Sequence, residues 1–317
     1  MDKVGFIGLG NMGGAIAERI RGAGFSLTVY DRRPEAAQPF AQRGAAVAGS
    51  AREVAERSDV VLSSLPAPPD VAAVTLGPGG VLEGIRAGGV FVDLTTSSPD
   101  LIRRLHGHFK ERGAHVLDAP LSGGRAEVVL GKQEITVGGD HDVFLRVRPI
   151  LAAFGDQIIY AGGLGAGAVC KLVHNMLMRD VTQAIAEGMT LGVKAGVSAE
   201  VVWEGIRRGL FGKQMVLHAA LPKTAFRGAY ESPTYTLALA QKDITLAMDL
   251  ARELNVSLPV SSIVEQINIH AMRRGWGARD SSVSFVLQEE AAGAEVRAPN
   301  IDTEKAARYI SIHPEFD

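Results

Sequence analysis

The feature that most constrains this chain is a glycine pattern directly behind its first apolar segment. Residues 4–8 are typical of a buried strand and residues 12–23 of a helix, and their junction reads Gly8-Leu9-Gly10-Asn11-Met12-Gly13. In such a turn the second glycine lets the backbone approach a pyrophosphate, and the helix start offers free N–H groups to the phosphates. The sequence therefore predicts a dinucleotide site at these six residues. The alternative is a glycine-rich turn without a ligand.

The chain alternates strand-like and helix-like segments up to about Gly163, which predicts a doubly wound α/β sheet with parallel crossovers. Short apolar runs predict strands at residues 4–8, 27–30, 60–65, 90–94, 115–119, 134–138 and 158–160. Apolar residues at helical spacing then predict helices at residues 167–195, 199–208, 235–254 and 260–274. We therefore expect a Rossmann domain at 1–163, an all-helical domain at 164–290 entered by a long interdomain helix, and a tail at 291–317.

The composition narrows the partners that this chain needs. Its 317 residues carry a formal net charge of −2, which gives no reason to expect nucleic acid or an anionic membrane as a partner. Cys170 is the single cysteine, which fits a reducing, cytoplasmic location. The first residues run straight into a strand-like segment without a basic region and a long apolar run, so we expect no signal peptide. No histidine or carboxylate cluster has the spacing of a metal site, and none is predicted. The apolar surface of the helical domain favours a homodimer or homotetramer.

The end of the second strand bears on the choice of cofactor. Asp31 lies there, about 20 residues behind the glycines, where an acidic side chain accepts hydrogen bonds from a ribose 2′-OH and repels a 2′-phosphate. Arg32 and Arg33 follow, and a pair of guanidinium groups suits a 2′-phosphate. We favour NAD because Asp31 holds the position nearest the ribose, and NADP stays an alternative.

Three further segments carry a resemblance to a known family. They read Asp-Ala-Pro-Leu-Ser-Gly-Gly at 118–124, Gly-Ala-Gly-Ala-Val-Cys-Lys-Leu-Val-His-Asn at 165–175 and Gln-Lys-Asp at 241–243. Together with the opening glycine motif they resemble the β-hydroxyacid dehydrogenase family, which includes 3-hydroxyisobutyrate dehydrogenases and tartronate semialdehyde reductases. The resemblance covers residues 3–290. It implies hydride transfer between NAD(P) and the alcohol carbon of a small 3-hydroxy acid, or reduction of the corresponding semialdehyde.

Lys171 and Asn175 are the candidate catalytic pair on the long helix. They are four residues apart and therefore share one helix face. A lysine partly removed from water has a lowered pKa and can take or return an alcohol proton. From spacing alone Lys171 could equally be a surface lysine whose stem lies along the protein. The resemblance implies that Lys171 is the general acid/base and that Asn175 binds substrate.

The segment Ser122-Gly123-Gly124 offers a hydroxyl and consecutive backbone N–H groups, an arrangement that suits a carboxylate. The resemblance implies that these three residues hold the acid group of the substrate. A plain turn between strand and loop is the alternative interpretation.

Four more residues are assigned to the cofactor by resemblance alone, namely Leu65, Pro66, Thr96 and Lys242. Each has a plainer alternative. Lys242 can be an exposed helix charge beside Asp243, and the segment 95–98 can cap a helix that starts at Pro99. Asp70 replaces a cofactor-contacting asparagine of one relative, which puts that contact in doubt.

The chain also departs from the family pattern. Arg125 follows the Ser-Gly-Gly segment and Lys213 lies in a later loop, which favours a larger substrate or one with a second carboxylate. The alternative is that both side chains lie in solvent. Two other functions share this fold: an imine reductase and a non-catalytic dinucleotide-binding scaffold. Lys171 argues against both, because such relatives commonly lack this lysine.

Overall fold

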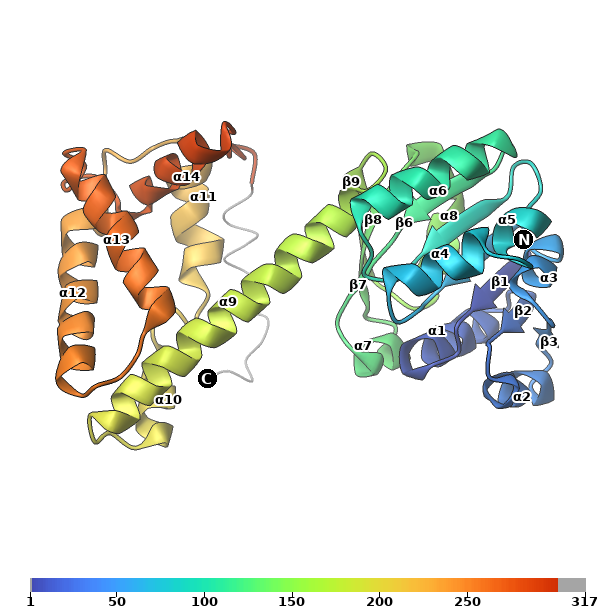
Figure 1. Ribbon diagram of the computed structural model, residues 1–317, viewed down its shortest axis with the longest axis horizontal. Helices are drawn as coiled ribbons and strands as arrows, with labels where there is room; N and C mark the ends of the chain where they lie inside the picture. Colours follow the sequence, from blue (N-terminus) through green and yellow to red (C-terminus); the bar gives the residue numbers. More distant parts are fainter. Residues whose placement is uncertain (1, 302–317) are drawn as a thin grey trace. The chain divides into compact units, whose positions relative to one another are not determined.

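The computed structural model describes residues 2–301, whose helices and strands are labelled in Figure 1. Compact packing divides the chain after Leu177, within the long helix α9 (Ala166–Lys194), so unit 1 ends and unit 2 begins inside one helix. Each unit is described by itself. Of the expected tail at 291–317, residues 302–317 lie outside the described residues.

Unit 1 is built on one sheet with the strand order β3-β2-β1-β4-β5-β6-β8-β7, and β9 pairs with β8. Six strands run parallel: β1 (Val4–Ile7), β2 (Leu27–Tyr30), β3 (Ala46–Val47), β4 (Val60–Ser63), β5 (Val90–Asp93) and β6 (His115–Asp118). The chain builds outward from β1 in both directions, so the switch point lies at the carboxyl end of β1, where ligands bind in such sheets. The predicted Rossmann-type sheet is confirmed.

The expectation of parallel crossovers is wrong at one edge of this sheet. There β7 (Leu121–Ser122) and β8 (Glu134–Gly138) are antiparallel, and β8 is also antiparallel to β6. Only the six-residue helix α7 (Arg125–Leu130) and a glycine turn join β7 to β8, and a parallel crossover needs a longer connection. The last strand, β9 (Gln157–Gly162), runs parallel to β8. The two-residue strands β3 and β7 are too short to leave an apolar pattern in the sequence.

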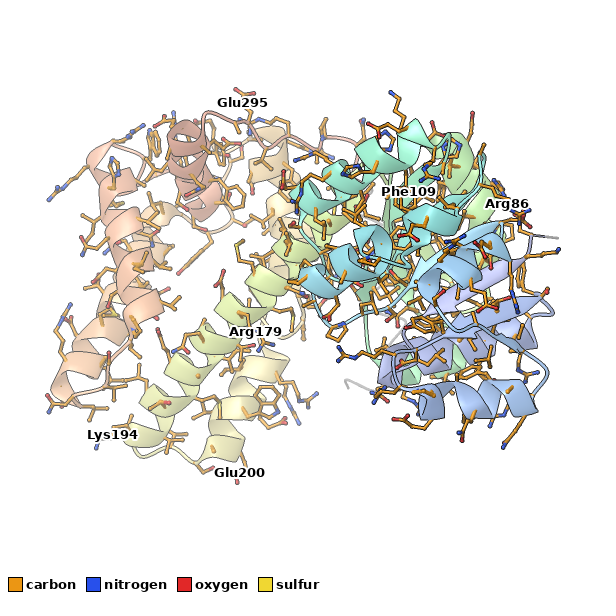
Figure 2. The ribbon with its side chains drawn as sticks, turned by 45° about the vertical axis from the view of Figure 1, so that its right-hand side comes forward. Arg86, Phe109, Arg179, Lys194, Glu200 and Glu295 are labelled. Atoms are coloured by element: carbon orange, nitrogen blue, oxygen red, sulfur yellow. The ribbon has the colours of Figure 1, made fainter. Side chains whose placement is uncertain are left out.

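Helices cover both faces of the sheet, and each face has its own apolar core. One core includes Ile16, Phe40 and Val147, which come from α1 (Asn11–Gly22), α2 (Pro34–Gln42) and α8 (His141–Leu151). The other includes residues of α3 (Ala51–Glu56), α4 (Pro68–Leu76), α5 (Val81–Gly84) and α6 (Pro99–Glu111). Within β1, Phe6 packs into the first core and Ile7 into the second, which explains its unbroken apolar run. In Figure 2 the buried Phe109 of α6 lies among the packed side chains of unit 1.

A buried carboxylate fixes the start of α9 against this sheet. Asp118, the last residue of β6, accepts hydrogen bonds from the backbone N–H of Gly165 at 2.8 Å and of Ala168 at 2.7 Å, one on each carboxylate oxygen. A side chain at Gly167 would place its Cβ 2.4 Å from the carbonyl oxygen of Thr136, so only glycine allows this approach. The negative charge also suits the partial positive charge of a helix start.

Unit 2 is helical, as predicted. Besides the end of α9 it contains α10 (Ala199–Arg208), α11 (Leu221–Lys223), α12 (Leu237–Glu253), α13 (Pro259–Arg273), α14 (Phe285–Ala292) and the short turns η1 (Val216–Ala220), η2 (Ala225–Arg227) and η3 (Ser281–Ser284). The only strand-like pairing among its described residues is the isolated bridge between Thr236 and Asp280. No helix within residues 2–301 has the length and apolar character of a membrane-crossing segment.

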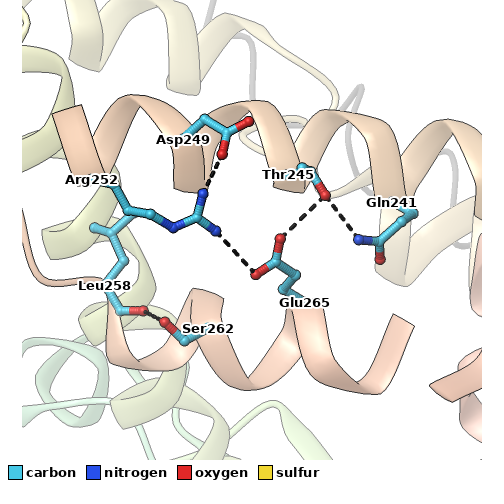
Figure 3. Close-up of polar contacts among 7 residues, drawn as sticks. All are labelled: Gln241, Thr245, Asp249, Arg252, Leu258, Ser262 and Glu265. Atoms are coloured by element: carbon cyan, nitrogen blue, oxygen red, sulfur yellow. Dashed lines mark hydrogen bonds and ion pairs between the residues drawn. The ribbon is translucent and has the colours of Figure 1, made fainter. Parts of the chain in front are cut away.

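Polar contacts between helices order the interior of unit 2. Glu187 of α9 accepts hydrogen bonds from the backbone N–H of Val260 and Ser261, and thereby caps α13, whose own N-cap residue Leu258 has no acceptor side chain. Figure 3 shows a second link, in which Thr245 of α12 donates to Glu265 of α13 at 3.2 Å.

The geometry at Asp118 predicts an unequal effect of two matched substitutions. In Asp118→Asn one oxygen becomes an NH₂ donor that faces a backbone N–H, so one buried donor loses its acceptor and stability falls by about 2 kcal/mol. Asp140 caps α8 through a single oxygen that accepts from the N–H of Asp142 and Val143, both at 3.0 Å. Asp140→Asn keeps that oxygen and is expected to cost only about 0.5 kcal/mol. Urea unfolding of the full chain measures both; equal losses would contradict the proposed anchor.

Candidate active site

A cleft of about 530 Å³ opens at the carboxyl ends of the first parallel strands, where the topology expects a ligand. Seven of the predicted cofactor residues line it: Gly8, Gly10, Asp31, Arg32, Arg33, Leu65 and Pro66. Asp70, whose cofactor contact the sequence left in doubt, also lines the cleft. The sequence interpretation missed other lining residues, namely Ile7, Tyr30, Ser50, Ala51, Ser64, Ala73, Val74 and residues 78–80. The Pro-Gly-Gly sequence at 78–80 indicates a turn, but nothing in it indicates that the turn faces this cleft.

The three motif glycines have different reasons to lack a side chain. A Cβ at Gly8, whose φ is +92°, would lie 2.3 Å from the carbonyl oxygen of Ser64. A Cβ at Gly13 would lie 1.9 Å from the carbonyl oxygen of Gly8. At Gly10, by contrast, a Cβ would meet no atom within 4 Å. The protein itself therefore requires Gly8 and Gly13, whereas Gly10 leaves open space before the start of α1, which fits the pyrophosphate of a dinucleotide.

Asp31, directly behind β2, is held in place by backbone hydrogen bonds. Its carboxylate accepts hydrogen bonds from the backbone N–H of Leu9 at 2.7 Å and of Arg33 at 2.9 Å. Burial works to raise the pKa of Asp31, but these backbone N–H groups and the Arg33 side chain together lower it below its usual value. Asp31 is therefore ionised at neutral pH at the mouth of the cleft.

The remaining predicted cofactor residues of unit 1 surround the same edge. Asn11 and Met12 form the first turn of α1, and the N–H of Leu65 donates to Thr95 Oγ1 at 3.1 Å. Thr96 is exposed and does not line the cleft. Ser98 accepts a hydrogen bond from the N–H of Leu101, so this segment does cap α6. That cap does not exclude a cofactor contact by Thr96, which stays a prediction.

Lys171 and Ser122, 49 residues apart in the sequence, meet in the structure. The Nζ of Lys171, on the second turn of α9, donates a hydrogen bond to the Oγ of Ser122 on β7 at 3.3 Å. Burial lowers the pKa of Lys171, and the nearby charge of Glu134 opposes part of this shift. Lys171 is thus partly removed from water and joined to the segment predicted to hold an acid group. Asn175, half-buried, lies one turn further along α9.

A buried glutamine supports Ser122 from behind, and the sequence interpretation did not find it. Gln133 is fully buried, and its Nε2 donates to the backbone carbonyl of Ser122 at 2.6 Å. Glu127 accepts a hydrogen bond from the N–H of Gly124 at 2.8 Å. The carboxylate of Glu127 therefore occupies one of the donors that a substrate acid group would use, so a bound substrate has to displace it or use the other donors.

Three charged residues named in the sequence analysis do not line the cleft, namely Lys242, Arg125 and Lys213. Lys242 is exposed in unit 2, and its Nζ lies 2.9 Å from Asp243, the pairing that the plainer interpretation expected. Its cofactor role stays a prediction. Arg125 and Lys213 are exposed and form no ion pair within the described residues. The part of the chain that the structure describes contains no group of three or more histidines, cysteines or carboxylates that could hold a metal ion.

Comparison with known proteins finds matches over nearly the whole chain. The model for the NAD-binding domain of 6-phosphogluconate dehydrogenase matches residues 3–162, and the model for the NAD-binding domain of NADP-dependent 3-hydroxyisobutyrate dehydrogenase matches residues 165–286. The chain belongs to the β-hydroxyacid dehydrogenase family. It is an NAD(P)-dependent dehydrogenase, and the resemblance inferred from its motifs is confirmed.

Two characterised relatives show the range of this family. A 2-(hydroxymethyl)glutarate dehydrogenase of Eubacterium barkeri is 32% identical over 294 residues, which are 93% of this chain and 97% of the relative. An NAD-dependent L-serine dehydrogenase of Pseudomonas aeruginosa is 34% identical over 297 residues, 92% of this chain and 100% of the relative.

Solved structures agree with the family assignment. A 3-hydroxyisobutyrate dehydrogenase of Mycobacterium tuberculosis, solved with L-serine, is 29% identical with a TM-score of 0.63 and covers 91% of this chain and 99% of its own. An imine reductase of Myxococcus stipitatus, solved with NAD⁺, has a TM-score of 0.81 at 19% identity and the same coverage, a likeness of fold alone.

Substitutions at two of the motif glycines, Gly10 and Gly13, are expected to separate an effect on binding from an effect on folding. Gly10→Ala places a methyl group in the open space before α1, so the dissociation constant for NADH is expected to rise about tenfold with unchanged thermal stability. Gly13→Ala drives a methyl group against the Gly8 carbonyl, so the fold is expected to lose about 2 kcal/mol. Fluorescence titration with NADH and thermal unfolding measure the two effects. Normal NADH binding by Gly10→Ala would show that the phosphates do not approach there.

Proposed function

We propose that this dehydrogenase oxidises the alcohol carbon of a small 3-hydroxy acid, or reduces the corresponding semialdehyde, with Lys171 as the general acid/base. The observation that supports this most directly is the hydrogen bond of 3.3 Å from Lys171 to Ser122. It joins the candidate proton carrier to the candidate carboxylate site, and a 3-hydroxy acid carries its hydroxyl and its acid group only a few bonds apart.

Lys171 acts on the substrate hydroxyl in both directions. In oxidation its neutral amine takes the hydroxyl proton as the carbonyl forms, and in reduction its ammonium form returns that proton to the oxygen. The lowered pKa of Lys171, caused by burial, enlarges the neutral fraction that oxidation needs. A bound NAD(P) supplies the hydride acceptor for oxidation and the hydride donor for reduction.

The acid group of the substrate is held by Ser122, Gly123 and Gly124 in this proposal. The Ser122 hydroxyl donates to one carboxylate oxygen, and the backbone N–H groups that follow donate to the other. The Asn175 side chain lies on the same helix face as Lys171 and hydrogen-bonds a substrate oxygen. Together these donors fix the hydroxyl carbon in one position relative to the amine.

NAD is the preferred dinucleotide in this proposal. The ionised Asp31 at the mouth of the cleft accepts ribose hydroxyls and repels a 2′-phosphate. Both arginines that could bind such a phosphate lie near carboxylates, since Arg33 Nε is 3.4 Å from Asp31 and Arg32 is 4.0 Å from Asp70. Their charge is therefore partly neutralised before any nucleotide binds.

The wider organisation is also part of the proposal. Residues 1–163 bind the dinucleotide, residues 164–290 complete the substrate site, and the chain works in the cytoplasm as a homodimer or homotetramer. The oligomer is supported by large apolar side chains of unit 2 that remain exposed, such as Leu246 at 60% and Ile263 at 63%.

The direct test follows the absorbance of NADH or NADPH as the enzyme acts on a panel of small 3-hydroxy acids with NAD or NADP. We expect turnover of at least one acid, with kcat/KM rising with pH up to the pKa of Lys171, below the 10.5 of a free lysine. Lys171→Arg keeps a positive charge but cannot release a proton, so kcat is expected to fall at least 100-fold.

The control for this experiment is Lys110→Ala, which removes an exposed lysine of α6 and should leave the rate unchanged. If Lys171→Arg kept a near-normal kcat and pH profile, Lys171 would not be the proton carrier. Absence of turnover with every acid and both dinucleotides would overturn the proposed reaction itself.

A further inference from the structure

Glu134 is an acidic residue that the strand pairing places beside the Lys171–Ser122 contact. It is the first residue of β8 and lies directly opposite Ser122 in the antiparallel register of β7 and β8. Residues opposite each other in such a pair carry their side chains on the same face of the sheet, with Cβ atoms roughly 5 Å apart. Glu134 and Ser122 are therefore neighbours on one face.

That face of β8 is the one against which α9 begins. Side chains alternate along a strand, so Glu134, Thr136 and Gly138 share a face while Ile135 points into the core on the other. A Cβ at Gly138 would lie 2.8 Å from the backbone nitrogen of Gly167, the second residue of α9. Lys171 follows Gly167 by one helical turn, and its hydrogen bond to Ser122 brings its Nζ to the residue that lies opposite Glu134.

The charge of Glu134 reaches Lys171 but is not neutralised by it. Glu134 acts to raise the pKa of Lys171, as expected for a carboxylate that the strand register places opposite Ser122. Yet the Glu134 carboxylate forms no hydrogen bond and no ion pair within 4 Å with any residue from 2 to 301. Glu127, by contrast, is engaged by the N–H of Gly124. Among residues 2–301, Glu134 is thus a half-buried carboxylate that has no hydrogen-bond donor of its own.

A carboxylate at this place is unfavourable for a substrate that brings only an acid group to Ser122, because like charges repel strongly in a partly buried site. A substrate with its own cation between acid group and hydroxyl removes this cost. A 2-amino-3-hydroxy acid carries three groups on adjacent carbons: a carboxylate, an ammonium and a hydroxyl. These groups match the Ser122 segment, Glu134 and Lys171 in chemistry.

We propose that Glu134 binds the ammonium group of the substrate, so that this enzyme prefers 2-amino-3-hydroxy acids to 3-hydroxy acids that lack a cation at carbon 2. The inference rests on the proposed function, because it uses the Ser122 segment as the acid-group site and Lys171 as the group at the hydroxyl. This preference differs from the sequence analysis, in which Arg125 favoured a substrate with a second carboxylate.

The experiment compares substrates that differ at carbon 2. Both enantiomers of serine carry an ammonium there, both enantiomers of glycerate carry a hydroxyl, 3-hydroxypropionate carries hydrogen, and 2-(hydroxymethyl)glutarate carries a second acid chain. We expect the full-length enzyme with NAD to show at least about tenfold higher kcat/KM for one serine enantiomer than for either enantiomer of glycerate. Calorimetric titration of the NADH-bound enzyme with the same compounds should show the same order of affinity.

The variants separate charge from shape. Glu134→Gln keeps the size but removes the charge. It should lower the preference for serine over glycerate about tenfold or more, because serine loses its partner and glycerate loses a repelling carboxylate. Glu134→Asp keeps the charge and should retain most of the preference. Glu111→Gln removes an exposed carboxylate at the end of α6 and serves as the control. Circular dichroism and thermal unfolding check that each variant is folded.

The outcomes distinguish the two proposals. If glycerate or 3-hydroxypropionate is turned over with Lys171 dependence but serine is not preferred, or if Glu134→Gln leaves the preference unchanged, the ammonium site is overturned and the proposed function stands. Preference for 2-(hydroxymethyl)glutarate would likewise overturn it in favour of a second carboxylate. If no compound is turned over with either dinucleotide, the proposed function fails and the ammonium site fails with it.

Discussion

The candidate active site depends on how the Asp118 carboxylate holds the start of α9. Both of its oxygens accept backbone N–H groups of that start, and Gly167 leaves no room for a side chain between helix and sheet. One turn later the same helix carries Lys171, which reaches the Ser122 hydroxyl on β7. Fixing the first turn of a helix also fixes the axial position and rotation of the residues on its next turns. The position of the Lys171 amine therefore depends on the Asp118 contact, although Asp118 is not itself assigned to substrate binding.

Much of the fold could be predicted because its signals are local. The glycine motif and the alternating apolar segments indicated the parallel strands, and helical spacing indicated α9, α10, α12 and α13 to within about two residues. The antiparallel edge could not be predicted. Its strand β7 has two residues, and its direction depends on the short connection through α7 rather than on any apolar pattern.

The site was only partly predictable for a related reason. Motif spacing could indicate Gly8 and Asp31, and the resemblance to the family could indicate Lys171, since each belongs to a pattern along the chain. Gln133 and Glu134 belong to no such pattern. Their positions arise from the pairing of β8 with β7: Gln133 donates to the backbone carbonyl of Ser122, and Glu134 lies opposite Ser122. Residues that act through strand register become visible only once the register is known.

The most direct test of this account is a crystal structure of the full chain with NADH and a 3-hydroxy acid, a pair that cannot react. The account predicts that Lys171 Nζ lies within about 3.2 Å of the substrate hydroxyl oxygen and that the acid group lies on the Ser122 segment, with α9 still held by Asp118. A substrate whose hydroxyl meets a different proton carrier, with Lys171 turned toward solvent, would contradict it.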